Sequence, residues 1–188
     1  MTPQLIENII TVLGKMKDLK RSGWLKRRVE APESDAEHSF SVAMLAWLLA
    51  PAELDRCRCL ELALTHDLVE IYSGDYTPVD NISPEEKHQR ELQAAHRLAA
   101  ELQQPGLLEL FSEYEAKETK ESIFINGLDK LDNVITAAWY DDRQRAPNPL
   151  LPEFSSYAKR RITALPDSET AQAILNYICN ERKSHEQD

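Results

Sequence analysis

Glycine and cysteine are both scarce in this chain of 188 residues, which contains five glycines and three cysteines. Because glycine is rare and apolar residues recur at spacings of three and four nearly everywhere, the chain is predicted to be all-α. Cys57, Cys59 and Cys179 are too few and too unevenly spaced for a disulfide framework. Cys57 and Cys59 also lack the second pair that a zinc site would need. We therefore expect reduced thiols.

The chain also lacks a long basic stretch and a long apolar run. Its formal net charge is -10 at pH 7, so nucleic acid is not expected as a partner. The same negative field repels anionic substrates, and any phosphate site therefore needs a local cation. The best apolar run, residues 42–50, stops at Pro51, far short of a membrane span, and no basic segment leads into an apolar one at the N-terminus. We expect a cytoplasmic protein without a membrane partner.

The chain contains enough apolar residues to form a core. Hydrophobic residues make up 42% of the chain and charged residues 29%. A chain of this length fits one domain. No repeat, low-complexity segment or linker divides it. Residues 1–188 are therefore predicted to form a single domain.

The helical spacing of the apolar residues, together with the residues that typically start and end helices, predicts a bundle of about seven to eight helices. Their approximate bounds are 5–20, 35–50, 55–71, 83–103, 107–116, 119–142, 153–164 and 167–183. Asp35 is a candidate cap of the second helix, and a basic, irregular link precedes it. The helices within residues 153–187 are expected to pack on the rest. The side chains predicted to face inward are Ile6, Ile9, Ile10, Leu13 and Met16 in the first helix and Phe40, Ala43, Met44, Trp47 and Leu48 in the second.

Two metal-competent side chains, His66 and Asp67, adjoin at the end of an apolar helix. Glu70 lies three and four residues further on and shares their face, and Asp75 follows at a turn after Gly74. For an isolated pair, a helix-end histidine beside an acidic neighbour is the more common explanation. Here the helix has a strongly apolar face, where a buried carboxylate requires a compensating cation. The segment therefore indicates a metal site.

A second histidine, His38, lies in the first turn of the second predicted helix, where polar residues border the apolar face that is expected to be buried. Alone, it would more often be a satisfied core histidine. With His66 and Asp67 it forms a set of two nitrogens and one oxygen that needs another carboxylate to hold a divalent cation. Asp129 and Asp132 can each supply it. They are three residues apart on one helix face, so their spacing does not choose between them.

This pattern of His38, the doublet His66-Asp67 and a distant aspartate resembles the HD superfamily of metal-dependent phosphohydrolases. The likeness spans about residues 19–142. The segments that carry it look like the 5'-deoxynucleotidase branch of that family: RSGWLKRRVEAPESDAEHSF, ALTHDLVEIYSGDYTP, NISPEEKHQRE and INGLDKLDNVITA. The resemblance implies a helical HD domain that binds one or two metal ions among its helices and hydrolyses phosphate esters.

The resemblance also implies a role for individual residues. The metal ligands would be His38, His66, Asp67 and Asp129, so the family pattern favours Asp129 over Asp132.

Other positions match the family's substrate and water contacts. Glu70 would orient or deprotonate the attacking water, and Asp75 matches a residue near the sugar or the reacting phosphate. Arg21 matches a basic residue that contacts the phosphate. Trp24 takes the place of a tryptophan that packs against the sugar in relatives, although here two residues separate it from Arg21.

The sequence therefore predicts a metal-dependent 5'-nucleotidase acting on deoxyribonucleoside 5'-monophosphates. The cofactor would be a divalent cation, whose identity among Co, Mn, Mg, Zn, Ni and Fe a mixed site does not fix. Two other hypotheses stay open: an HD phosphohydrolase acting on nucleoside triphosphates or phosphodiesters, and a noncatalytic metal-binding helical module. The resemblance also implies a homodimer.

Overall fold

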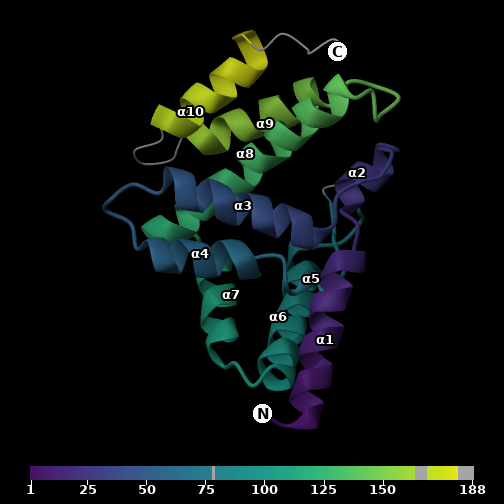
Figure 1. The fold of residues 1–188 in the computed structure, drawn as a ribbon, viewed down its shortest axis with the longest axis vertical. Coiled ribbons are helices and arrows are strands. Elements are labelled where there is room, and N and C mark those ends of the chain that lie inside the picture. Colours follow the sequence, from purple (N-terminus) through teal and green to yellow (C-terminus); the bar gives the residue numbers. More distant parts are fainter. Residues whose placement is uncertain (78, 164–168, 182–188) are drawn as a thin grey trace.

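Helices make up the regular structure of this protein in a computed structural model, which describes residues 1–77, 79–163 and 169–181 (Figure 1). The eight longer helices are α1 (Pro3–Asp18), α3 (Asp35–Leu49), α4 (Arg56–Thr65), α6 (Pro84–Glu101), α7 (Gly106–Ala116), α8 (Lys120–Asp142), α9 (Leu151–Thr163) and α10 (Glu169–Asn176). The all-α prediction is confirmed. The last predicted helix, 167–183, lies partly outside the described residues.

Two short helices were not predicted. One is α2 (Ser22–Lys26), which lies within the link expected to be irregular. The other is α5 (Glu70–Ser73), because the helix expected over 55–71 breaks after Thr65. Leu68 N–H donates to the Thr65 carbonyl and Glu70 N–H to the Asp67 carbonyl, so bonds three residues apart tighten the chain there. A π-helical turn (Tyr177–Glu181) follows α10.

The start of α3 differs from the prediction by one residue. Ser34, not Asp35, caps the helix: its hydroxyl accepts from Glu37 N–H, and the Glu37 carboxylate accepts from Ser34 N–H. This reciprocal pair satisfies two backbone donors of the first turn. Asp35 is thereby released from capping and is fully buried.

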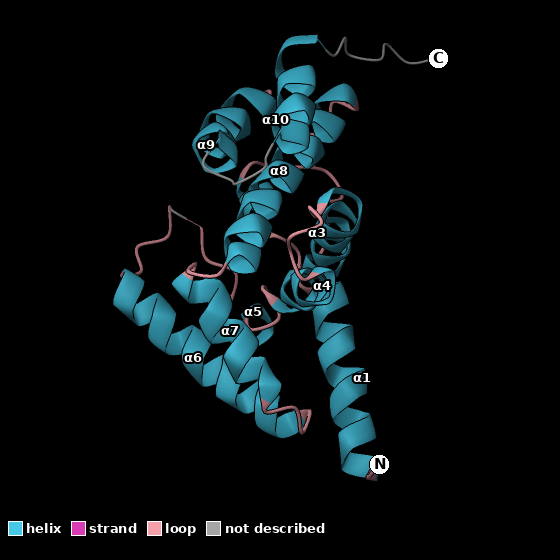
Figure 2. Ribbon diagram, turned by 90° about the vertical axis from the view of Figure 1, so that its left-hand side faces the viewer, coloured by secondary structure: helices cyan, strands magenta, loops and turns pink. Residues whose placement is uncertain are grey.

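The long helix α8 is the axis of the main core. Its buried residues include Leu128, Leu131 and Val134, which pack with apolar side chains of α3, α4, α9 and α10. A second apolar cluster joins α1 and α5 to α6 and α7. The helices α6 and α7 lie side by side in the lower half of the molecule (Figures 1 and 2). No helix in the described parts of the chain is long and apolar enough to cross a membrane.

The predicted inward faces of the first two long helices were largely wrong. Val42, Ala43 and Ala46 face the core from α3, and Val12 and Met16 do so from α1. The larger apolar side chains point to solvent instead: Ile6, Ile10 and Leu13 on α1 and Phe40, Met44, Trp47 and Leu48 on α3. Small residues face the core of α3 because they let a neighbouring helix approach closely, so side-chain size misled the assignment.

Leucines on the two sides of α4 should differ in their contribution to stability. Leu62 is fully buried in the main core, whereas Leu64 is 52% exposed. Leu62→Ala should lower the free energy of unfolding by about 2 to 5 kcal/mol because it leaves a cavity. Leu64→Ala should change it by no more than about 0.5 kcal/mol. Urea titration of both variants measures the difference, and equal losses would contradict this packing.

Candidate metal centre

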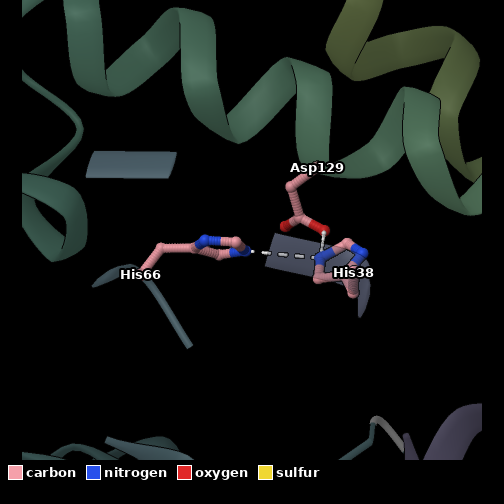
Figure 3. Close-up of side chains that lie close together, drawn as sticks. All are labelled: His38, His66 and Asp129. Carbon is pink, nitrogen blue, oxygen red and sulfur yellow. Dashed lines mark hydrogen bonds and ion pairs between the residues drawn. The ribbon is translucent and has the colours of Figure 1, made fainter. Parts of the chain in front are cut away.

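Three elements bring the predicted ligands together at the centre of the molecule. His38 comes from the first turn of α3, His66 and Asp67 from the turn after α4, and Asp129 from α8. Figure 3 shows both imidazole rings and the Asp129 carboxylate converging on one point. His38 is fully buried, and His66 and Asp129 are 6% and 5% exposed. The break after Thr65 is what turns the His66-Asp67 doublet toward α3 and α8.

Hydrogen bonds behind the histidines fix how their rings point. The Nδ1 atom of His38 lies 2.8 Å from Asp132 Oδ2, and Nδ1 of His66 lies 2.8 Å from the Ala63 carbonyl oxygen. Both partners can accept a hydrogen bond, so Nδ1 of each ring is engaged from behind and Nε2 of each ring faces the cluster. This is the arrangement in which metal-binding histidines are usually held.

The spacing of the donor atoms suits one cation. The two Nε2 atoms are 3.3 Å apart, and Asp129 Oδ1 lies 3.4 Å from His38 Nε2. Asp67 Oδ2 lies 3.3 Å from His66 Nε2 and 3.6 Å from His38 Nε2. Nitrogen and oxygen ligands about 2.0–2.2 Å from a common ion stand roughly 3 to 3.5 Å from each other. The cluster of His38, His66 and Asp129 could therefore hold a divalent metal ion.

The two carboxylates of the cluster are ionised despite their burial. Burial raises the pKa of Asp67, but His66, Arg21 and His38 together bring it well below its usual value. Burial likewise raises the pKa of Asp129, but Lys130 and His38 bring it well below its usual value. Lys130 Nζ lies 2.6 Å from Asp129 Oδ2. Both groups are thus in the state in which a carboxylate binds a cation.

Asp129 and Asp132 lie on opposite sides of His38. Asp129 faces the Nε2 side with the other donors, and Asp132 bonds the Nδ1 atom from behind. This geometry favours Asp129 as the ligand, and Asp132 holds the ring.

Arg21 is fixed beside the cluster by the backbone around it. Its N–H donates to the Glu33 carbonyl, and the Asp35 N–H donates to the Leu19 carbonyl, which joins the end of α1 to the start of α3. Arg21 Nη1 then lies 2.7 Å from Asp67 Oδ2. The guanidinium reaches the metal cluster from a segment far away in the sequence.

Glu70 and Asp75 lie on the same side of the cluster as Arg21. Burial raises the pKa of Glu70 well above its usual value, and the negative charges of Asp67 and Asp75 add to the effect. Its Oε2 atom is buried and has no hydrogen-bond partner in the described residues. Gly74, whose φ of 91° favours glycine, turns the chain so that Asp75 accepts from Ser22 N–H.

Trp24 lies deeper than the predicted sugar contact suggests. The side chain is 1% exposed, and its ring packs 5.3 Å from Tyr140 and 4.5 Å from Phe154, measured between ring centroids. Its indole N–H donates to Glu33. Trp24 still belongs to the cavity lining, so contact with a sugar stays a prediction.

The sequence analysis missed Asp35 as a member of the site. Both of its carboxylate oxygens are buried without a hydrogen-bond partner among the described residues, and Oδ1 lies 3.7 Å from Arg21 Nη1. Burial raises its pKa to about 7, and the charge of Asp67 adds to that rise. The spacing of Ser34 and Glu37 was an available signal, because a capping box there leaves Asp35 free for another role.

The cluster opens into a cavity of about 580 Å³. Its lining contains the predicted site residues Arg21, Trp24, Asp67, Glu70, Asp75 and Asp129. Tyr114, Lys130 and Asn133, which the sequence analysis did not single out, also line it. Tyr114 and Asn133 both donate to the Asp129 carboxylate. The structure thus brings two predicted ligands, Asp67 and Asp129, to one cavity with the Arg21 guanidinium and the unpaired Oε2 atom of Glu70.

Residues 13–184 match the family model described as an HD domain. The chain belongs to the HD domain family. Human 5'-deoxynucleotidase HDDC2 is 35% identical over 152 residues, which cover 79% of this chain and 74% of that protein. The 5'-deoxynucleotidase hdd1 of Schizosaccharomyces pombe is 35% identical over 136 residues and 69% of each chain.

Solved structures share this HD fold. The PH0347 protein of Pyrococcus horikoshii OT3 has a TM-score of 0.77 and 30% identity, with 92% of this chain and 97% of that chain covered. A predicted metal-dependent phosphohydrolase from Magnetospirillum magnetotacticum MS-1 has a TM-score of 0.69 and 26% identity, with 92% of each chain covered. The donor cluster and these likenesses agree on an HD domain built for a divalent metal.

Removing a ligand and removing the group behind it should have different effects on metal affinity. His66→Ala should abolish stoichiometric binding of Mn²⁺ or Co²⁺, whereas Asp132→Asn should weaken it by about 10- to 100-fold because the His38 ring loses its anchor. Calorimetric titration measures both. His88→Ala, on the exposed side of α6, is the matched control and should bind as the unaltered chain does. Full affinity in the His66 variant would rule out this centre.

Proposed function

We propose that this HD domain is a metal-dependent 5'-nucleotidase that releases phosphate from deoxyribonucleoside 5'-monophosphates. One observation carries the proposal: a buried metal-competent cluster shares its cavity with Glu70, whose Oε2 has no partner in the described residues, and with the Arg21 guanidinium. A cavity of 580 Å³ is of the size that holds small organic ligands. The 5'-deoxynucleotidase names of the relatives support the substrate class.

The residues of the chain divide the chemistry among them. His38, His66, Asp67 and Asp129 would hold the cation, which acts as a Lewis acid toward the phosphate. Glu70 accepts a proton from the attacking water, and its buried Oε2 atom has no hydrogen-bond partner among the described residues that would compete for that role.

Arg21 and Asp75 act on the substrate itself. Arg21 neutralises charge on a nonbridging phosphate oxygen, and Asp75, which lines the same cavity, contacts the sugar or the phosphate. The water oxygen bonds to phosphorus as its proton passes to Glu70, and the bond from phosphorus to the 5' oxygen breaks. The 5' oxygen takes a proton from solvent, to which Glu70 releases its own. Nucleoside and inorganic phosphate are the products.

A substrate panel tests the proposal. Phosphate release should occur from deoxyribonucleoside monophosphates in the presence of Mn²⁺, Co²⁺, Mg²⁺, Zn²⁺ or Ni²⁺, and should be slower from di- and triphosphates. Glu70→Gln should lower kcat by about 100- to 10,000-fold and leave metal affinity unchanged, because it removes the base and no ligand.

Glu91→Gln provides the control for Glu70, since Glu91 is a buried glutamate on α6 outside the cavity and pairs with Lys87. It should retain activity. Release from triphosphates or phosphodiesters alone would favour a different HD phosphohydrolase. No release from any substrate, with metal bound, would favour a noncatalytic metal-binding module and reject the proposal.

We also propose a homodimer formed through the outer faces of α1 and α3. Figure 2 shows these two helices on the same side of the molecule. Ile10 and Leu13 on α1 are 59% and 56% exposed, and Phe40 and Leu48 on α3 are 64% and 61% exposed. A two-fold interface sets one patch against itself, which an uncharged apolar patch tolerates and a charged one resists. The net charge of -10 makes such an uncharged patch the favoured contact between copies.

One substitution on this surface should separate the copies. Trp47 is 53% exposed on α3, and Trp47→Asp should reduce the mass measured by light scattering from twice 21.5 kDa to 21.5 kDa. Val79→Asp, at an exposed apolar residue of the cavity rim, should leave the mass unchanged. A monomeric unaltered chain at micromolar concentration would refute the dimer.

A further inference from the structure

The cavity beside the metal cluster is lined by charged side chains and, on α9, by two aromatic rings. Asp67, Glu70, Asp75 and Asp129 belong to its lining. From α9 come Glu153, Phe154, Ser156 and Tyr157. The rotation of α9 is fixed because Ala158 and Ile162 are buried in the main core. One face of α9 is thereby turned toward the cavity.

Tyr157 is one of these lining residues, as is Lys130, which pairs with Asp129. The Tyr157 side chain is 47% exposed. Tyr157 is therefore an exposed residue of the cavity lining.

The faces of the two aromatic rings on α9 differ in what covers them. Phe154 packs against Trp24, at 4.5 Å between centroids, and under the Arg27 guanidinium. Tyr157 has neither a ring partner nor a hydrogen-bond partner among the residues that the structure describes. An exposed ring at the rim of a cavity is a surface that a ligand can cover.

A second apolar residue lines the same cavity. Val79 is 71% exposed and comes from the loop that follows Asp75. This loop lies on the same side of α8 as α9 (Figure 2). Tyr157 and Val79 thus contribute exposed, uncharged surface from two elements to the cavity beside the metal cluster.

A nucleotide suits a lining that offers both charged side chains and an open aromatic ring, since its phosphate is charged and its base is flat and neutral. We propose that the Tyr157 ring is the stacking surface for the nucleobase, with Val79 at the edge of that subsite, and that it makes the protein prefer nucleotides to simple sugar phosphates. The inference rests on the proposed 5'-nucleotidase function. Every base has an aromatic face, so such a subsite tolerates all four bases.

The test compares substrates with and without a base. For Tyr157→Ala, kcat/KM for 2'-deoxyadenosine and 2'-deoxycytidine 5'-monophosphate should fall by about 5- to 150-fold, mainly through KM, because stacking is lost. Hydrolysis of 2-deoxyribose 5-phosphate should not change. Tyr157→Phe keeps the ring and should behave as the unaltered chain does. Tyr177→Ala is the matched control, because Tyr177 is 54% exposed and lies outside this cavity.

Binding provides a readout that does not depend on turnover. Calorimetric titration with 2'-deoxyadenosine should show the same fold-loss of affinity in Tyr157→Ala, and Tyr157→Leu, which keeps an apolar side chain, should show an intermediate loss. Equal losses for deoxyribose 5-phosphate and for nucleotides, or no loss for either, would overturn the stacking role. If the unaltered chain hydrolyses none of these substrates, the proposed function fails, and the titration still decides whether Tyr157 binds a base.

Discussion

The burial of several carboxylates around one point is the constraint on which the rest of this structure depends. Asp35, Asp67, Asp129 and Asp132 are buried or nearly so and lie within reach of one another through His38 and Arg21. Ionised carboxylates in a low-dielectric interior require positive charge or protons. Arg21 and Lys130 supply part of that charge, and the raised pKa of Asp35 and Glu70 reflects what is left uncompensated. A divalent cation held by the donor cluster would complete the balance.

The helices are arranged so that this charged centre stays rigid. His38 is held in a helix whose start is locked by a capping box, and its ring is anchored by Asp132 from α8. His66 and Asp67 lie where α4 ends and backbone hydrogen bonds three residues apart follow, so the side chains of two adjacent residues can point toward the same place. Since the donors come from three packed elements, their relative positions depend on the apolar core around α8.

The apolar residues on the outer surface result from helix packing rather than from the charged centre. The face of α3 toward the core is built from small side chains, which permit close helix packing, and its large apolar residues remain on the outside. Helical period alone does not reveal which stripe is buried when both sides of a helix carry apolar residues. That ambiguity explains why the bounds of α1 and α3 followed from the sequence and their inward faces did not.

The sequence by itself determined the all-α class, the bounds of six of the eight longer helices to within about two residues, and the candidate metal-binding side chains. These features follow from the helical spacing of apolar residues, from capping residues and from the chemistry of single side chains, all of which act locally. Only the tertiary structure decided on which side of His38 each of Asp129 and Asp132 lies, where the doublet helix breaks, and how deeply Asp35 and Trp24 are buried. Those outcomes depend on which helices approach one another and how closely, and packing between distant segments sets that approach.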